Sequence, residues 1–218
     1  MHILVLDTIH GGIEIGDSYA DAGNVVDVVD LYTNTTPETA ENSKNQTYDL
    51  IVAPVHMDPD HTLLSNRSAP VITHHEAVCH LLGEKLPVPM IEITGSRGKT
   101  TTAYALAHIL SGHGVLHTSA GTYAYPTKDL LWKRSITPAS VLAAAKYAKQ
   151  HSGWLVAECS LGVTGAGDLA ILTSAEDYTF AAGKKSAIKE KIASVIHAKR
   201  ILVADGISCD HENVVHIE

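Results

Sequence analysis

The most informative part of this sequence reads Ile91-Glu92-Ile93-Thr94-Gly95-Ser96-Arg97-Gly98-Lys99-Thr100-Thr101-Thr102. Its first residues predict a buried strand, and the glycines that follow predict a loop leading into a helix. In that arrangement, successive backbone N–H groups and the helix N-terminus surround an anion. The spacing is G-x-x-G-K-T, which is shorter than the usual G-x-x-x-x-G-K-[ST] of phosphate loops. The pattern predicts a site for a nucleoside triphosphate.

The residue types in this loop suggest distinct tasks. Lys99 would place a positive charge on the terminal phosphates, and the hydroxyl of Thr100 is a candidate Mg²⁺ ligand. The predicted nucleotide-binding residues are Gly95, Ser96, Arg97, Gly98, Lys99, Thr100 and Thr101.

The loop at 94–101 resembles the TGTNGKTT-type loop of the Mur ligase family, whose members use ATP to join amino acids to a carboxylate. Four further stretches are similar to motifs of that family and occur in the same order. They are Thr118-Ser119-Ala120-Gly121-Thr122, Ile136-Thr137-Pro138, Val156-Ala157-Glu158-Cys159-Ser160 and Asp168-Leu169-Ala170-Ile171-Leu172-Thr173. The resemblance extends from Met90 to about Ala204.

This resemblance implies an ATP-dependent ligase that activates a carboxylate as an acyl phosphate, with ATP and Mg²⁺ as cofactors. It implies that Lys99 and Glu158 are catalytic and that Thr100 and Glu158 hold the Mg²⁺. Magnesium and the lysine would neutralise charge on the phosphoryl group as it transfers.

A third catalytic candidate is Lys189, because Ser186-Ala187-Ile188-Lys189 is similar to a family helix whose lysine is carbamylated in several relatives. Lys185 and Lys191 compete for that role. A solvated basic helix face is the alternative for all three.

The sequence also departs from the family. Ser174 stands where the family has Asn, and Glu176-Asp177-Tyr178 replaces its Asp-His-Leu-Asp. The sequence stops near Glu218, before the C-terminal domain that relatives normally add. We therefore expect the chain to be a fragment of a longer ligase or a shortened member, whose C-terminal domain a separate partner chain could supply.

Outward from the loop, short Val/Ile/Leu runs alternate with helical patterns, which predicts an α/β fold with mainly parallel sheets. We expect a small Rossmann-like N-terminal substrate-type domain over 1–83, a linker over 84–89, and a P-loop Mur-ligase-like ATP-binding central domain over 90–218. The predicted strands are 3–6, 25–29, 48–55, 69–73, 90–94, 114–118, 155–158, 169–172, 201–204 and 214–217. The predicted helices are 13–22, 74–82, 99–110, 138–150 and 184–196, and residues 32–47 are expected to be a surface loop.

The N-terminal part offers a candidate substrate site. Asp7 follows the first predicted strand, and His10-Gly11-Gly12 predicts a tight turn into a helix. These residues either contact a ligand at the sheet edge or meet the steric needs of the turn. The opening is similar to that of a Mur-like ligase branch in methanogenic archaea that completes coenzyme F-430. That similarity implies a small-molecule substrate, a nickel tetrapyrrole carboxylate, which undergoes a final ring closure onto carbon.

Histidines are unusually frequent, with 14 in the chain. His56, His61, His74 and His75 lie in the N-terminal half. Asp58 and Asp60 stand between the first two, so this loop could present metal ligands or could simply be solvated.

Composition excludes several function classes. The 218 residues carry 16 basic and 24 acidic side chains, a formal net charge of −8. Without a basic tract, nucleic acid and anionic membrane surfaces are poor partners. No apolar run approaches the roughly 20 residues of a membrane-spanning helix. The three widely spaced cysteines favour reduced thiols and a cytoplasmic location.

Two other functions remain open. The first is a P-loop nucleotide switch or a nickel metallochaperone, and the second is a non-catalytic ATP-binding remnant of a Mur-type ligase. A GTPase switch should carry an N/T-K-x-D segment after a late strand. Neither Thr173-Ser174-Ala175-Glu176 nor Asp205-Gly206-Ile207-Ser208 matches it, which favours ATP.

Overall fold

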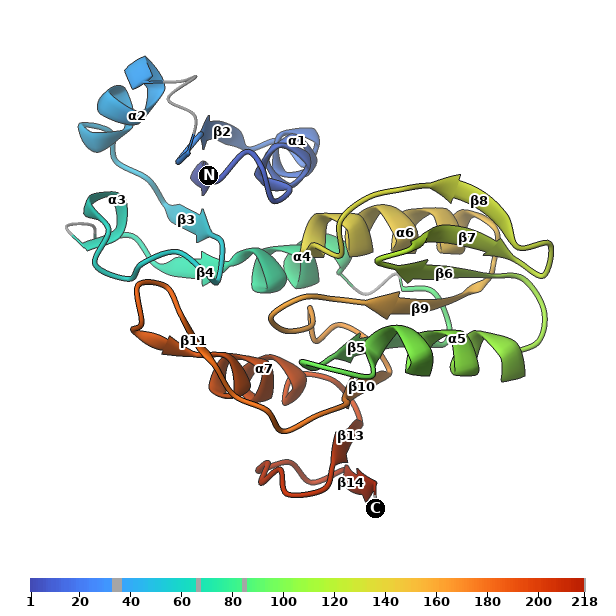
Figure 1. Cartoon of the computed structure of the whole chain (residues 1–218). Coiled ribbons are helices and arrows are strands. Elements are labelled where there is room, and N and C mark those ends of the chain that lie inside the picture. Colours follow the sequence, from blue (N-terminus) through green and yellow to red (C-terminus); the bar gives the residue numbers. More distant parts are fainter. Residues whose placement is uncertain (33–36, 66–67, 84–85, 218) are drawn as a thin grey trace.

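The structure, a computed structural model, describes residues 1–32, 37–65, 68–83 and 86–217. The chain forms a four-stranded sheet from its N-terminal part and an eight-stranded sheet from the remainder, with helices packed against both (Figure 1). The predicted α/β class with mainly parallel sheets is confirmed.

The N-terminal sheet is entirely parallel, in the order β2-β1-β3-β4. Its strands are β1 (His2–Leu6), β2 (Val25–Val29), β3 (Leu50–Ala53) and β4 (Val71–Thr73). Successive side chains of β1 point to opposite faces. Ile3 and Val5 pack against α1 (Gly12–Asp21) and α4 (His74–Leu82), whereas Leu4 and Leu6 lie in the core beneath α2 (Pro37–Lys44) and α3 (Thr62–Ser65).

The larger sheet has the order β14-β13-β10-β5-β9-β6-β7-β8. Its strands are β5 (Met90–Thr94), β6 (Gly114–Thr118), β7 (Gly121–Tyr125), β8 (Asp129–Trp132), β9 (Trp154–Glu158), β10 (Leu169–Leu172), β13 (Ile201–Ala204) and β14 (Val214–Ile217). Its pairings are parallel except for β6–β7 and β7–β8. Helix α5 (Lys99–Ile109) covers the face that carries Ile91 and Ile93, and α6 (Pro138–Gln150) covers the face that carries Met90.

Helix α6 belongs to both halves of the molecule. Its first turns place Ala139 and Leu142 in the core of the N-terminal sheet, beside α4. The same helix places Val141 and Ala144 in the core of the larger sheet. Figure 1 shows α4 and α6 meeting where the two sheets adjoin. The predicted domains at 1–83 and 90–218 and the linker at 84–89 stay predictions, and residues 84–85 of that linker lie outside the described residues.

Three sequence predictions need correction. The expected loop at 32–47 contains helix α2, whose Ala40 packs beneath the N-terminal sheet. Strands β7 and β8 were not predicted at all. The last helix, α7 (Ala187–Val195), begins three residues later than the predicted start at 184. The residues before it, Lys185–Ser186, instead form strand β12, which pairs with β11 (Thr179–Phe180).

No helix in the described part of the chain is long and apolar enough to cross a membrane.

Candidate active site

The predicted phosphate loop connects β5 to α5. Gly95 has φ +145°, and a Cβ there would lie 2.2 Å from Thr173 Oγ1 of the neighbouring strand end, so only glycine fits. Gly98 has φ +83° and is the N-cap of α5. Because first-turn amides have no partner within a helix, the N-terminus of α5 presents N–H groups at the end of the loop. The loop therefore has the geometry of an anion site.

Lys99, Thr100 and Glu158 come together at this loop, as the sequence predicted. Glu158 ends β9, the strand that pairs with β5, and is buried. Thr100 Oγ1 donates a hydrogen bond of 2.9 Å to Glu158 Oε2, and Lys99 Nζ lies 3.8 Å from Glu158 Oε1. A hydroxyl and a carboxylate that converge in this way are the oxygen donors that Mg²⁺ prefers.

The structure narrows the set of amides that can face phosphate. The N–H groups of Ser96 and Arg97 donate to Ser174 Oγ, at 2.8 and 3.2 Å. The Arg97 side chain is exposed and forms an ion pair with Glu176. Thr101 is exposed in the first turn of α5. Ser174, the departure from the family's Asn, thus supports the loop by accepting two of its amides.

Among the three candidate lysines, the structure brings Lys191 to this loop and leaves Lys189 exposed. Lys191 is 1% exposed, its Nζ donates to Ser96 Oγ at 3.0 Å, and it lies 5.1 Å from the centre of the Tyr178 ring. Burial lowers the pKa of Lys191, and the nearby charge of Lys99 lowers it further, against the opposing effect of Asp177 and Glu176. Lys185 instead forms an ion pair with Glu190.

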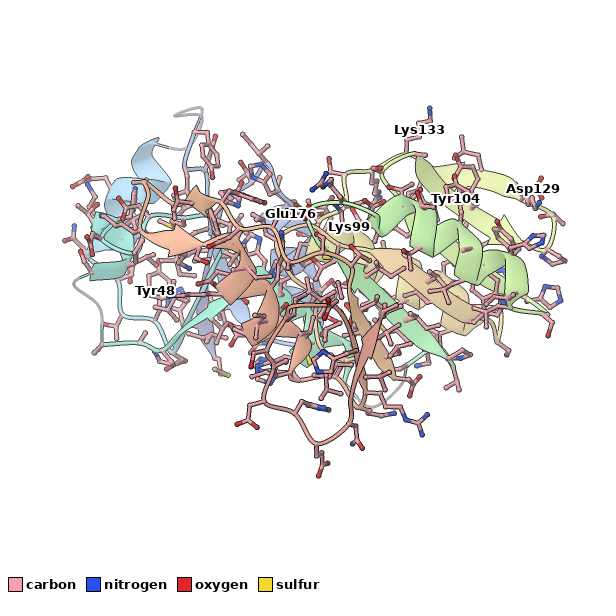
Figure 2. All side chains as sticks on the ribbon, turned by 60° about the horizontal axis from the view of Figure 1, so that its bottom comes forward. Tyr48, Lys99, Tyr104, Asp129, Lys133 and Glu176 are labelled. Carbon is pink, nitrogen blue, oxygen red and sulfur yellow. The ribbon has the colours of Figure 1, made fainter. Side chains whose placement is uncertain are left out.

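Figure 2 shows Lys99 at the start of α5 with Glu176 beside it, near the middle of the molecule, while Tyr48, just before β3, lies far away in the N-terminal part. The loop that carries Glu176 contacts the phosphate loop, where the Ser96 hydroxyl donates to the Glu176 carbonyl at 3.1 Å.

A second feature is a cavity of about 390 Å³ between the N-terminal sheet and the start of α6. His10, Tyr32 and His56 line it from the N-terminal side, and Thr137, Pro138 and Ser160 from the other. Ser160 follows Glu158 by two residues, so one strand end reaches both the cavity and the phosphate loop. The cavity and the phosphate loop are thus connected through the end of β9.

Of the four predicted substrate residues, the two glycines have a steric explanation. A Cβ on Gly11 would lie 2.4 Å from Ala139 Cβ of α6, and one on Gly12 would lie 1.9 Å from the carbonyl oxygen of Asp7. His10 lines the cavity, and Asp7 is buried beside it with its Oδ2 2.5 Å from His10 Nδ1. A substrate role for these residues stays a prediction.

The metal site considered for the loop at 56–61 does not form as proposed. Asp58 and Asp60 are both held by Lys184 Nζ at 2.7 Å, which ties this loop to the β11–β12 hairpin. His61 Nδ1 accepts the N–H of Leu63. His56 turns away from this loop and towards Asp7, whose Oδ2 lies 3.5 Å from His56 Nε2.

His74 and His75 are core residues. Nε2 of His74 donates to the Leu6 carbonyl at 2.9 Å, and Nε2 of His75 donates to the Ser160 carbonyl at 3.0 Å. Burial lowers the pKa of each to about 4, so both are neutral at neutral pH.

Comparison with known families agrees with this geometry. Residues 93–174 match the model of the Mur ligase middle domain. This segment of the chain is therefore similar to the middle domain of Mur ligases. Lys99, Thr100, Glu158 and Ser174 all lie within the matched segment, whereas Lys191 and the N-terminal cavity lie outside it.

Relatives extend the match beyond the Mur ligase middle domain. The chain is 34% identical to a protein named coenzyme F(430) synthetase from Methanosarcina acetivorans, in an alignment covering 90% of this chain and 48% of that one. It is 28% identical to a protein of the same name from Methanocaldococcus jannaschii, covering 90% and 50%. The chain thus spans about half the length of the curated relatives it matches. Among solved structures, aspartate transcarbamoylase from Trypanosoma cruzi aligns over 98% of this chain and 74% of that one, at 12% identity and a TM-score of 0.28, too low to carry an argument.

Two contributors to the site were missed in the sequence. Tyr32 reaches His56 Nε2 with its hydroxyl at 2.9 Å, but it lies in a segment interpreted as a loop. In the sequence, Ser174 stands out only as a departure from the Mur ligase pattern, and its contacts with the phosphate loop are not evident. The sequence did hold a signal, because Ser174 follows the end of a buried parallel strand by two residues, at the same sheet edge as the phosphate loop.

Proposed function

We propose that this chain is the substrate-binding and nucleotide-binding part of an ATP-dependent ligase that activates a carboxylate as an acyl phosphate. The convergence of Lys99, Thr100 and Glu158 at a Mur-type phosphate loop carries this proposal. The names of the two relatives support it.

The chemistry follows from the charges at the loop. A carboxylate oxygen of the substrate attacks the γ-phosphorus of ATP, the bond to the β,γ-bridging oxygen breaks, and ADP leaves with that electron pair. Lys99 neutralises negative charge on the transferring group, and the N-terminus of α5 holds the phosphates. Thr100 and Glu158 would hold Mg²⁺, which supplies further charge neutralisation when bound. A substrate nucleophile then attacks the acyl carbon, and inorganic phosphate leaves.

For the substrate, we propose a nickel tetrapyrrole carboxylate whose final ring closure joins the acyl carbon to a ring carbon. The shared name of the relatives supports this choice. The cavity beside Ser160 adds support, because Val55, Ile136 and Pro138 give it apolar walls suited to a largely apolar ring system. Asp7 and His10 are the proposed substrate-side residues at that cavity.

We propose Lys191, in place of Lys189, as the lysine that is carbamylated. A lysine whose pKa is lowered by burial is more often neutral, and a neutral amine is the form that reacts with carbon dioxide. A carbamate on Lys191 would place a negative group beside Ser96 and Lys99, where it could help to hold a second cation. We include it in the proposed catalytic set with Lys99 and Glu158.

A cytoplasmic location also belongs to this proposal, supported by three unpaired cysteines. The proposed partner is a C-terminal ligase domain, since each matched relative is about twice the length of the aligned segment.

The test compares wild type, Lys99→Ala and, as a matched control, Lys149→Ala, whose lysine is exposed in the last turn of α6. Nucleotide binding is measured by calorimetry with Mg-ATP and Mg-GTP. We expect ATP to bind in preference to GTP, and Lys99→Ala to weaken ATP binding at least about tenfold, because a positive charge at the phosphates is lost. Lys149→Ala should match wild type.

The same proteins are then assayed for phosphate release from ATP, with and without a nickel seco-tetrapyrrole acid. Substrate-dependent release that Lys99→Ala lowers at least about 100-fold supports the ligase. A preference for GTP would support the switch instead. ATP binding without release, even when the C-terminal half of a relative is added, would identify a non-catalytic remnant.

A further inference from the structure

A cluster of metal-binding side chains lies at the carboxyl ends of two neighbouring strands of the N-terminal sheet. Asp7 directly follows β1, and His56 lies in the loop after β3. In the sheet order β2-β1-β3-β4, the chain adds β2 on one side of β1 and then adds β3 and β4 on the other side. The order of strands therefore reverses between β1 and β3, although all the strands are parallel. In open parallel sheets, this reversal leaves a crevice at the strand ends where ligands bind. The cluster therefore occupies the position at which the fold itself makes a site.

The ligand atoms of the cluster converge on one point. Asp7 Oδ2 lies 2.5 Å from His10 Nδ1 and 3.5 Å from His56 Nε2. The candidate ligand atoms of these three residues all lie within 4.8 Å of one another. The Tyr32 hydroxyl lies 2.9 Å from His56 Nε2 and adds a fourth polar atom.

Asp7 is held so that one oxygen stays available for this point. Its Oδ1 accepts the N–H groups of Ile9 and His10 at 2.8 and 3.1 Å, which leaves Oδ2 to face the imidazoles. The residue has φ +82°, a backbone conformation that is strained for a residue other than glycine. Such strain concentrates at binding and catalytic positions.

Asp7 is the buried carboxylate of the cluster. It is 0% exposed. In the described part of the chain, its ion-pair partners are His10 and His56, with no lysine or arginine among them. A buried carboxylate is stable only when it is paired or coordinates a metal.

We propose that Asp7, His10 and His56 bind one first-row divalent transition-metal ion, with the Tyr32 hydroxyl beside it. Two imidazoles and one carboxylate suit zinc, nickel, cobalt or iron(II), unlike the all-oxygen donor set at Thr100 and Glu158. Three protein ligands leave open coordination positions, and because His10 and His56 line the cavity, those positions face a molecule bound there. The proposal does not depend on the ligase activity.

The test uses the whole chain at neutral pH, with Zn²⁺ in equilibrium dialysis and Co²⁺ in absorption spectroscopy. We expect one tight equivalent of either metal, with Co²⁺ ligand-field bands that show nitrogen and oxygen coordination. His56→Ala and His10→Ala should each weaken binding at least about tenfold, since each removes a ligand. The matched control is His108→Ala, because His108 is exposed on α5 and far from this cluster in the chain.

Circular dichroism and urea unfolding of each variant establish that it folds, so that lost binding reports a lost ligand. Loss of the tight equivalent in both cluster variants, with His108→Ala unchanged, supports the site. Two results would overturn it. One is the absence of a tight equivalent in wild type, which would leave the cluster as a proton-sharing Asp–His pair, and the other is equal binding by all three variants, which would place the metal on surface histidines.

Discussion

Lys191 and Lys189 differ by two positions on one helix, and this small difference decides which of them faces the phosphate loop. Residues two apart on a helix point in directions about 200° apart. Lys191 therefore faces Ser96 while Lys189 faces solvent. The sequence could not choose between them, because the helix was predicted to begin at 184 and its orientation depends on the start at Ala187.

We predict that Lys191 carries the carbamate. After addition of ¹³C-bicarbonate, the wild-type protein should show one carbamate carbon signal in ¹³C NMR, which strengthens as pH rises because the neutral amine becomes more abundant. Lys191→Ala should lose this signal, and Lys189→Ala, the exposed neighbour, should retain it. A signal that disappears in Lys189→Ala alone would restore the assignment first made from sequence.

The phosphate loop could be predicted residue by residue because its signal is local. Gly95, Gly98, Lys99 and Thr100 lie within six positions, and backbone sterics fix where each of them points. Glu158 required the family resemblance. The partnership of Asp7 with His56 depends on the pairing of β1 with β3, and nothing in the spacing of these two residues encodes that contact.

At the scale of elements, the turn before α1 sets how closely α1 approaches α6. We predict that Gly11→Ala destabilises the protein by about 3 kcal/mol or more, from backbone strain together with overpacking against Ala139. The matched control is Gly23→Ala. Gly23 has φ +85° but no atom within 4 Å of the added Cβ, so this substitution should lower the free energy of unfolding by only about 1 kcal/mol. Urea unfolding measures both.

Equal losses in the two glycine variants would contradict this prediction. They would mean that the backbone conformation alone matters and that contact between α1 and α6 contributes nothing. A larger loss in Gly11→Ala assigns the difference to the junction between the two sheets.

Elements with a strong periodic or capping signal were predicted well, and those stabilised mainly by tertiary contacts were not. The helix at 74–82 matches α4, where Thr73 and Glu76 form a capping box. Helix α2 is short and polar and its propensity is weak, so the segment was interpreted as a loop. Strands β7 and β8 are added in antiparallel order at the edge of the sheet, which an alternating β/α pattern does not predict.

At the scale of the whole molecule, three buried histidines link stability to pH. Burial lowers the pKa of His74, His75 and His117 to about 4. Unfolding returns each to about 6.5, so the unfolded chain binds more protons between these values and stability falls as pH falls through that window. Each histidine should lower the free energy of unfolding by about 2 kcal/mol between pH 7 and pH 5.

We therefore predict that the urea midpoint of the wild type decreases steeply from pH 7 to pH 5. His75→Gln keeps a donor for the Ser160 carbonyl but cannot titrate, so its midpoint should fall less over the same range. His108→Ala, which changes an exposed histidine, should follow the wild type. A His75→Gln curve parallel to wild type would show that this residue does not cause the acid sensitivity.

Helix α6 limits how this protein could be recombined with its relatives. Ala139 and Leu142 lie in the core of the N-terminal sheet, and Val141 and Ala144 lie in the core of the larger sheet. The side chains of this one helix must therefore pack against two different sheets. A chimera with one crossover near residue 89 would set a foreign helix against the N-terminal sheet and leave its core mismatched. A working exchange of substrate halves therefore needs a second crossover that carries the first turns of α6 along with the N-terminal sheet.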